Sequence, residues 1–103
     1  MTIRLSIDQL TERIDEFGKR CGESKGTYRT LYLAEHRYSS WCREIRKKRM
    51  SLRSPKILNA ERIYGEALSL EAEGGDIKRV ASKILYAGRC LLSHLVDQYH
   101  KLR

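Results

Sequence analysis

The chain has 103 residues, of which 41% are hydrophobic and 33% are charged, and its 21 Lys and Arg against 13 Asp and Glu give a net charge of +8. This composition excludes wholesale disorder, and the length fits one domain or a small domain with an appended helical piece. The core of such a chain is modest, so we expect a homodimer or a higher homo-oligomer.

The sequence carries no signal for membrane insertion or secretion. No apolar run approaches the roughly 18 residues of a membrane span, and the N-terminus lacks the apolar core of a signal peptide. Three cysteines, an odd number, stand at wide spacings at Cys21, Cys42 and Cys90. That pattern is typical of reduced thiols in a cytosol rather than of a disulfide framework. We therefore expect a cytoplasmic protein that does not bind membranes.

The first element expected in chain order is a short β-strand over residues 2–7. Apolar residues alternate there with polar ones, namely Ile3, Leu5 and Ile7 with Thr2, Arg4 and Ser6. This is the period of a strand that is buried on one face. A lone strand leaves its backbone N–H and C=O groups unpaired, so it needs a second copy of the chain. The alternative is a lead-in to the next helix, in which Ser6 and Gln9 form a capping box.

Four helices are expected to follow, each marked by apolar residues three or four positions apart. They cover residues 8–21, 27–54, 55–73 and 77–99. Their boundaries rest on stop and cap signals, which are Gly22 after the first helix, Ser24 or Thr27 before the second, Ser54 and Pro55 at the start of the third, Gly74 and Gly75 after it, and Asp76 before the fourth.

Positive charge is concentrated in one short segment. Residues 43–56 contain seven Lys and Arg residues against the single acidic residue Glu44. Such a local field attracts polyanions, above all nucleic acid, because neutralised phosphates release their counterions. The alternative is a solvated helix end whose cations complement the helix dipole. The nucleic-acid contacts predicted from this segment are Arg43, Arg46, Lys47, Arg49 and Arg53.

The order of strand, helix, Gly-x-Ser-Lys turn and second helix resembles the ribbon-helix-helix family of DNA-binding proteins over residues 2–40. Besides the alternating strand, the matching residues are Leu10, Ile14, Phe17, Gly18, Cys21, Gly22, Ser24 and Lys25. In that family two chains pair their N-terminal strands as a ribbon in the major groove. The resemblance implies that Thr2, Arg4 and Ser6 touch base edges, with Arg4 suited to guanine. It also implies a phosphate contact near Ser24 and Lys25, at the N-terminus of the second helix.

The expected fold class is mainly α. A dimeric ribbon-helix-helix unit with a basic helix end occupies residues 1–53, and a helical hairpin for oligomerisation or contact with a protein partner occupies residues 54–103. An all-α four-helix bundle is the alternative.

The expected function is sequence-specific binding of DNA, or of RNA, by a repressor or a plasmid- or phage-type accessory factor. There are two alternatives. One is a small helical subunit of a nucleoprotein complex that binds the nucleic-acid backbone without reading sequence. The other is a small inhibitor or adaptor that docks on a nucleic-acid-processing enzyme. Salt dependence and base-specific protection distinguish these functions.

No catalytic, cofactor or metal site is expected. Cys90 and His94 stand four residues apart on one helical face, a spacing that can bind a metal, but no second ligand pair accompanies them. Cys42 and His36 fall on different faces of one helix, which disfavours a nucleophile dyad. The sequence also lacks a Gly-rich phosphate loop and a recognisable catalytic triad. We therefore do not expect an enzyme.

Overall fold

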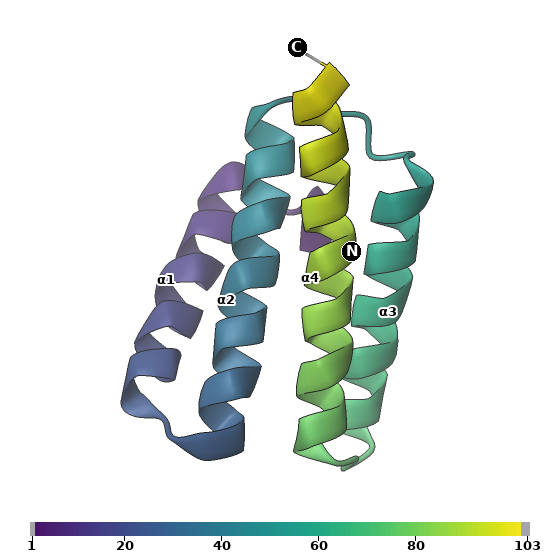
Figure 1. Cartoon of the computed structure of the whole chain (residues 1–103). Coiled ribbons are helices and arrows are strands. Elements are labelled where there is room, and N and C mark those ends of the chain that lie inside the picture. Colours follow the sequence, from purple (N-terminus) through teal and green to yellow (C-terminus); the bar gives the residue numbers. More distant parts are fainter. Residues whose placement is uncertain (1, 102–103) are drawn as a thin grey trace.

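The computed structural model describes residues 2–101, which fold into a short 3-10 helix and four α-helices. The elements are η1 (Thr2–Arg4), α1 (Ile7–Glu23), α2 (Gly26–Lys47), α3 (Pro55–Ala72) and α4 (Ile77–Lys101). α1 packs on α2, α2 on α4 and α4 on α3, so the helices stand in the order α1, α2, α4, α3 (Figure 1). The molecule measures 41 × 24 × 22 Å. Within residues 2–101, none of the helices is long and apolar enough to cross a membrane.

The expected N-terminal strand is wrong, and with it the ribbon-helix-helix fold. Residues 2–101 contain no strand, and the structure agrees with the all-α alternative. Ser6 is the N-cap of α1: its hydroxyl accepts the N–H of Gln9 at 3.1 Å, while the Gln9 side chain accepts the N–H of Ser6 at 3.0 Å. This is the capping box that the competing interpretation predicted. The alternation of the segment also fails as a burial pattern, because Ile3 is fully buried and Ile7 is exposed.

Tertiary hydrogen bonds explain why the N-terminal segment needs no second chain. The N–H of Ile3 donates to Oε1 of Glu61 on α3 at 3.1 Å. Arg46 on α2 donates from Nη1 to the carbonyl oxygens of Ile3 at 2.9 Å and Leu5 at 3.0 Å. Backbone groups that a ribbon would offer to a partner strand are thus satisfied within the chain.

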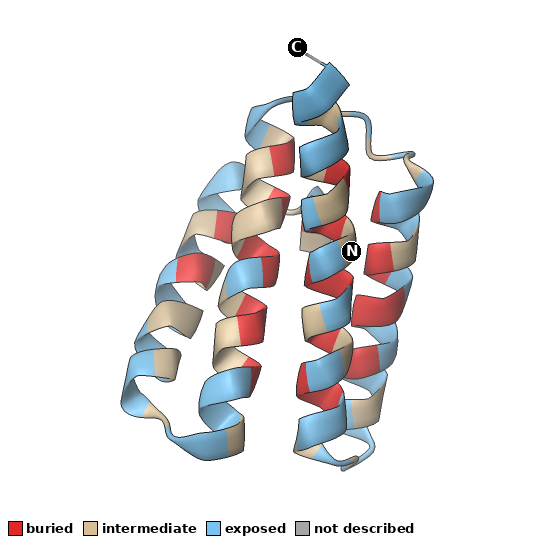
Figure 2. Ribbon diagram, viewed as in Figure 1, coloured by how far each residue is buried: buried red, intermediate tan, exposed pale blue. Residues whose placement is uncertain are grey.

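The hydrophobic core is continuous across all five elements. Figure 2 shows the buried residues along the faces that the four helices turn toward one another. The largest fully buried side chains of the core include Ile3 of η1, Leu10 of α1, Tyr38 and Ile45 of α2, Ile57 and Tyr64 of α3, and Ile84 and Leu91 of α4.

A polar brace crosses this core between α2 and α3. The rings of Tyr38 and Tyr64 stack with centroids 4.2 Å apart. Each tyrosine donates to a carboxylate of the opposite helix, Tyr38 to Glu61 at 2.7 Å and Tyr64 to Glu35 at 2.6 Å. Arg13 of α1 donates to the Tyr64 hydroxyl at 2.7 Å and forms an ion pair with Glu35 at 3.5 Å. Burial raises the pKa of the Glu35 carboxyl, while the Tyr64 hydrogen bond and the Arg13 charge act in the opposite direction.

Most predicted helix boundaries agree with the structure, and three differ. Gly22, the predicted stop of the first helix, lies inside α1, which continues to Glu23. Asp76 accepts the N–H of Lys78 at 3.1 Å at the start of α4, and Gly74, with φ of 77°, follows the end of α3. The second helix, however, ends at Lys47 rather than at residue 54, and its N-cap is Lys25, which makes no side-chain cap hydrogen bond. The predicted division of the chain at residue 53 falls in the loop between α2 and α3.

Candidate nucleic-acid interface

The three residues expected to read bases have other positions in this fold. Thr2 is half-buried in η1, and its side chain interacts with Tyr64. Ser6 is occupied by the capping box of α1. Arg4 is exposed and lies beside other cations. Residues 2–101 contain no strand, so Thr2, Arg4 and Ser6 do not form the ribbon from which they were expected to read bases.

Ser24 and Lys25 lie at the opposite end of the bundle from the remaining predicted contacts. They form the turn between α1 and α2, whereas Arg46 and Lys47 are at the other end of α2. Since α2 has 22 residues, the two groups are separated by about 30 Å along its axis. The structure therefore does not bring Ser24 and Lys25 into one site with the basic segment.

Six cations gather where α2 ends, and we call this group the basic end. It comprises Arg4, Arg46, Lys47, Lys48, Arg49 and Arg53. Arg46 is half-buried, and the other five are exposed. Among residues 2–101, the ion pairs engage Arg13, Arg20, Lys56 and Arg62, so no cation of the basic end is paired with a carboxylate there.

The two outer members of the basic sequence segment are used inside the fold. Arg43 donates to the Thr11 hydroxyl of α1 at 3.2 Å. Lys56 forms an ion pair with Asp97 and donates to the Ser93 hydroxyl of α4 at 2.7 Å. This pairing lowers the pKa of the Asp97 carboxyl. Arg43 and Lys56 thus bridge neighbouring helices, and the rest of the cations in this segment belong to the basic end.

Three arginines of the basic end share one open depression of about 500 Å³. Arg4, Arg46 and Arg49 line it, with Met50 and Leu52 as its apolar part, and none of its lining residues is acidic. The bonds to the carbonyl oxygens of Ile3 and Leu5 fix Nη1 of Arg46. A guanidinium held in this way is preorganised, so little side-chain entropy remains to be lost when it binds an anion.

Arg49 occupies a backbone conformation that favours glycine. Its φ is 53°, and the N–H groups of Arg49 and Met50 donate to the carbonyls of Arg46 at 3.1 Å and Ile45 at 3.2 Å. These bonds are the Schellman motif, whose left-handed position is usually Gly. The end of α3 has the same motif with Gly74 at that position. Arg49 therefore stands in the depression despite a backbone cost that glycine would avoid.

Neither histidine-cysteine pair gathers into a metal or catalytic site. Among residues 2–101, no three His, Cys, Asp or Glu side chains are grouped so that they could hold a metal ion. Sγ of Cys90 is 3.7 Å from Nδ2 of Asn59, and His94 is buried. Burial lowers the pKa of His94. Burial likewise raises the pKa of the Cys42 thiol, which opposes formation of a thiolate nucleophile.

The polar brace and one surface groove were not foreseen in the sequence. Glu35 and Glu61 each sit beside an alanine and three positions before a tyrosine. That carboxylate-to-tyrosine spacing on both helices was a usable signal for a buried pair. Arg37 and Arg89, which face one groove from α2 and α4, carry no comparable signal because they are 52 residues apart in the chain.

In comparisons with known proteins, no protein-family model, no curated protein and no solved structure matches the chain.

Proposed function

We propose that the protein binds the phosphate backbone of nucleic acid without reading base sequence, and that the basic end is the binding surface. The observation that carries this proposal is the arginine-lined depression with its three surrounding cations and no acidic residue in its lining. Backbone phosphates are the ligands that such a group attracts through Coulomb interaction and counterion release.

The chemistry of the basic end favours backbone contacts over base contacts. Lys47, Lys48 and Arg53 lie at a helix end and in the following loop, which is not an element that enters the major groove. Long exposed cations of this kind position a protein on a duplex and carry no sequence information by themselves. Arg4, Arg46 and Arg49 form a cradle for one phosphate, in which a guanidinium can make two parallel hydrogen bonds.

A salt titration on duplexes of different sequence tests the proposal. Because the six cations surround one helix end, about half of them can face one backbone at once, so log K should fall against log salt with a slope of about −3. The slope should be the same on two unrelated DNA duplexes, and an RNA duplex of equal length tells which backbone geometry binds more tightly.

Two triple variants, each of which removes three positive charges, test where the binding surface lies. Lys47→Gln, Lys48→Gln and Arg53→Gln together should reduce the magnitude of the slope by about 1 to 2. Lys78→Gln, Arg79→Gln and Lys83→Gln, which remove the same charge near the start of α4 at the other end of the bundle, should leave it nearly unchanged. Equal effects of the two triple variants would mean that binding depends on net charge and not on the basic end, which would contradict the proposal. No binding to any duplex would reject the proposal and favour a protein target.

A further inference from the structure

A mostly apolar groove runs between α2 and α4, away from the basic end. Its volume is about 480 Å³. Leu85 and Leu92 of α4 line one wall, and Trp41 of α2 lines the other. Gly88 forms part of the floor, and a Cβ added there would lie 3.8 Å from Cδ1 of Trp41. The indole thus packs close to the α4 backbone and leaves the groove open.

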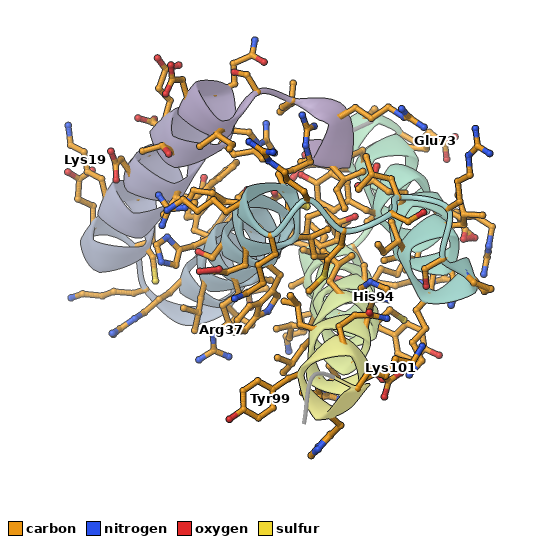
Figure 3. The ribbon with its side chains drawn as sticks, turned by 90° about the horizontal axis from the view of Figure 1, so that it is seen from above. Lys19, Arg37, Glu73, His94, Tyr99 and Lys101 are labelled. Atoms are coloured by element: carbon orange, nitrogen blue, oxygen red, sulfur yellow. The ribbon has the colours of Figure 1, made fainter. Side chains whose placement is uncertain are left out.

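Exposed apolar side chains continue the groove along α4. Leu92 is 38% exposed, Val96 44% and Tyr99 59%. Positions 92, 96 and 99 follow the helical repeat, so they form one stripe together with Leu85. Figure 3 shows Arg37 and Tyr99 projecting from the same side of the bundle, where α2 and α4 meet. The apolar surface is therefore longer than the groove itself.

The charges at the groove are positive on both walls. Arg37 of α2 and Arg89 of α4 line it and are exposed. Neither is in an ion pair within residues 2–101, and the groove lining contains no carboxylate. Arg37 is 11 residues into α2 and Arg89 is 12 residues into α4. Because both helices run in the same direction (Figure 1), the two arginines lie at about the same level along the axis of the bundle.

We propose that this groove docks an amphipathic helix of a partner protein, whose apolar face fills the groove and whose acidic residues pair with Arg37 and Arg89. A channel between two helices accepts a third helix through anchors spaced three or four residues apart. The cations on both walls select acidic flanks on the incoming helix.

Two other occupants of an apolar groove are a second copy of this chain and a nucleic-acid strand, and the lining of the groove disfavours both. If two copies paired through this face about a twofold axis, Arg37 and Arg89 of each copy would meet cations, and like charges across an interface are destabilising. A nucleic-acid strand would need aromatic faces for its bases. Trp41 is the aromatic residue of the lining, which otherwise consists mainly of aliphatic residues and arginines.

The fluorescence of Trp41 reports occupancy directly, because it is the single tryptophan of the chain. The probe is a synthetic helical peptide without tryptophan, with Leu at positions i, i+3, i+7 and i+10 and Glu on both flanks. Its control has Lys in place of every Glu. We expect the acidic peptide to shift the Trp41 emission to shorter wavelength saturably, and the basic peptide to have no such effect.

Charge reversal tests the pairing without disturbing the core. Arg37→Glu with Arg89→Glu should weaken binding of the acidic peptide at least about ten-fold and create binding of the basic peptide. Lys78→Glu with Arg79→Glu, an equal change of charge on two exposed residues of α4 that do not line this groove, should have little effect. Equal binding of both peptides to the wild type would overturn the proposal.

Two further outcomes would overturn it in favour of another occupant. A protein-concentration-dependent Trp41 shift without peptide, abolished by Leu92→Asp, would show self-association. A larger Trp41 shift with a single-stranded oligonucleotide than with the acidic peptide would show nucleic-acid binding in the groove. The Lys47, Lys48 and Arg53 triple should leave peptide binding unchanged, so failure here and failure of phosphate binding at the basic end are separate results.

Discussion

Replacing Arg49 by glycine should raise the stability of the protein and lower its affinity for nucleic acid at the same time. Arg49 is the left-handed residue of the Schellman motif that ends α2, with φ of 53°. Its side chain lines the arginine depression and makes no ion pair within residues 2–101. The folded protein thus loses a strained residue, and the proposed site loses a cation.

The change in stability follows from the backbone conformation of residue 49, and the change in affinity follows from the lost positive charge. A non-glycine residue in the left-handed region costs about 1–2 kcal/mol, whereas glycine loses about 0.5–1 kcal/mol more backbone entropy on folding. The free energy of unfolding should therefore rise by about 0.5–1 kcal/mol, and the melting temperature by about 2–8 °C for a chain of this size. Loss of one phosphate contact should reduce the magnitude of the salt slope by about 0.9.

Thermal melts and salt titrations on Arg49→Gly and Arg49→Ala separate these effects. Both variants remove the cation, but alanine keeps the backbone cost, so only the glycine variant should melt at higher temperature. Gly74→Ala provides the reciprocal control: its Cβ would meet nothing within 4 Å, so a loss of about 1 kcal/mol would come from the backbone alone. A glycine variant no more stable than the alanine variant would refute the strain argument, and unchanged salt slopes would refute the phosphate contact.

Three other changes test the fold. Ser6→Ala should cost about 1 kcal/mol in urea unfolding, since it removes the side-chain acceptor for the N–H of Gln9; no loss would reject the capping box. Tyr38→Phe leaves Glu61 with one hydrogen bond fewer and should cost about 1–3 kcal/mol, and a smaller cost would mean that water replaces the hydroxyl. His94 has a pKa lowered by burial from 6.5, so the unfolded chain binds the proton first and stability should fall as pH drops below about 6.5. His94→Leu should flatten the melting temperature between pH 7.5 and pH 5, and an unchanged profile would assign the acid loss to other groups.

The four helices were predictable because their signals are local. Apolar residues at helical spacing mark each buried face, and Asp76, Ser54-Pro55 and Gly74 stand at boundaries where the structure has a cap, a first-turn proline and a left-handed residue. Each of these signals acts within about one helical turn. The end of α2 escaped prediction because Arg49 takes the place that Gly usually marks.

The N-terminal segment was decided by residues far away in the chain. Alternation over six positions suits a strand, but it also allows one turn of 3-10 helix followed by a capping box. The choice lies with Glu61 and Arg46, which bind the backbone of Ile3 and Leu5. Unpaired backbone groups must find partners, and the sequence does not show that these partners come from α2 and α3.

Composition and local charge determined that the chain is basic and that its excess charge lies in residues 43–56. Only the tertiary structure decided which of those cations are free. It placed Arg43 against Thr11 and Lys56 against Asp97, and it brought Arg4 to Arg46 and Arg49 around one depression. The same packing set Arg37 opposite Arg89 across the α2–α4 groove. Charge counts are additive along a sequence, whereas a binding surface depends on which side chains the packed helices bring to the same place.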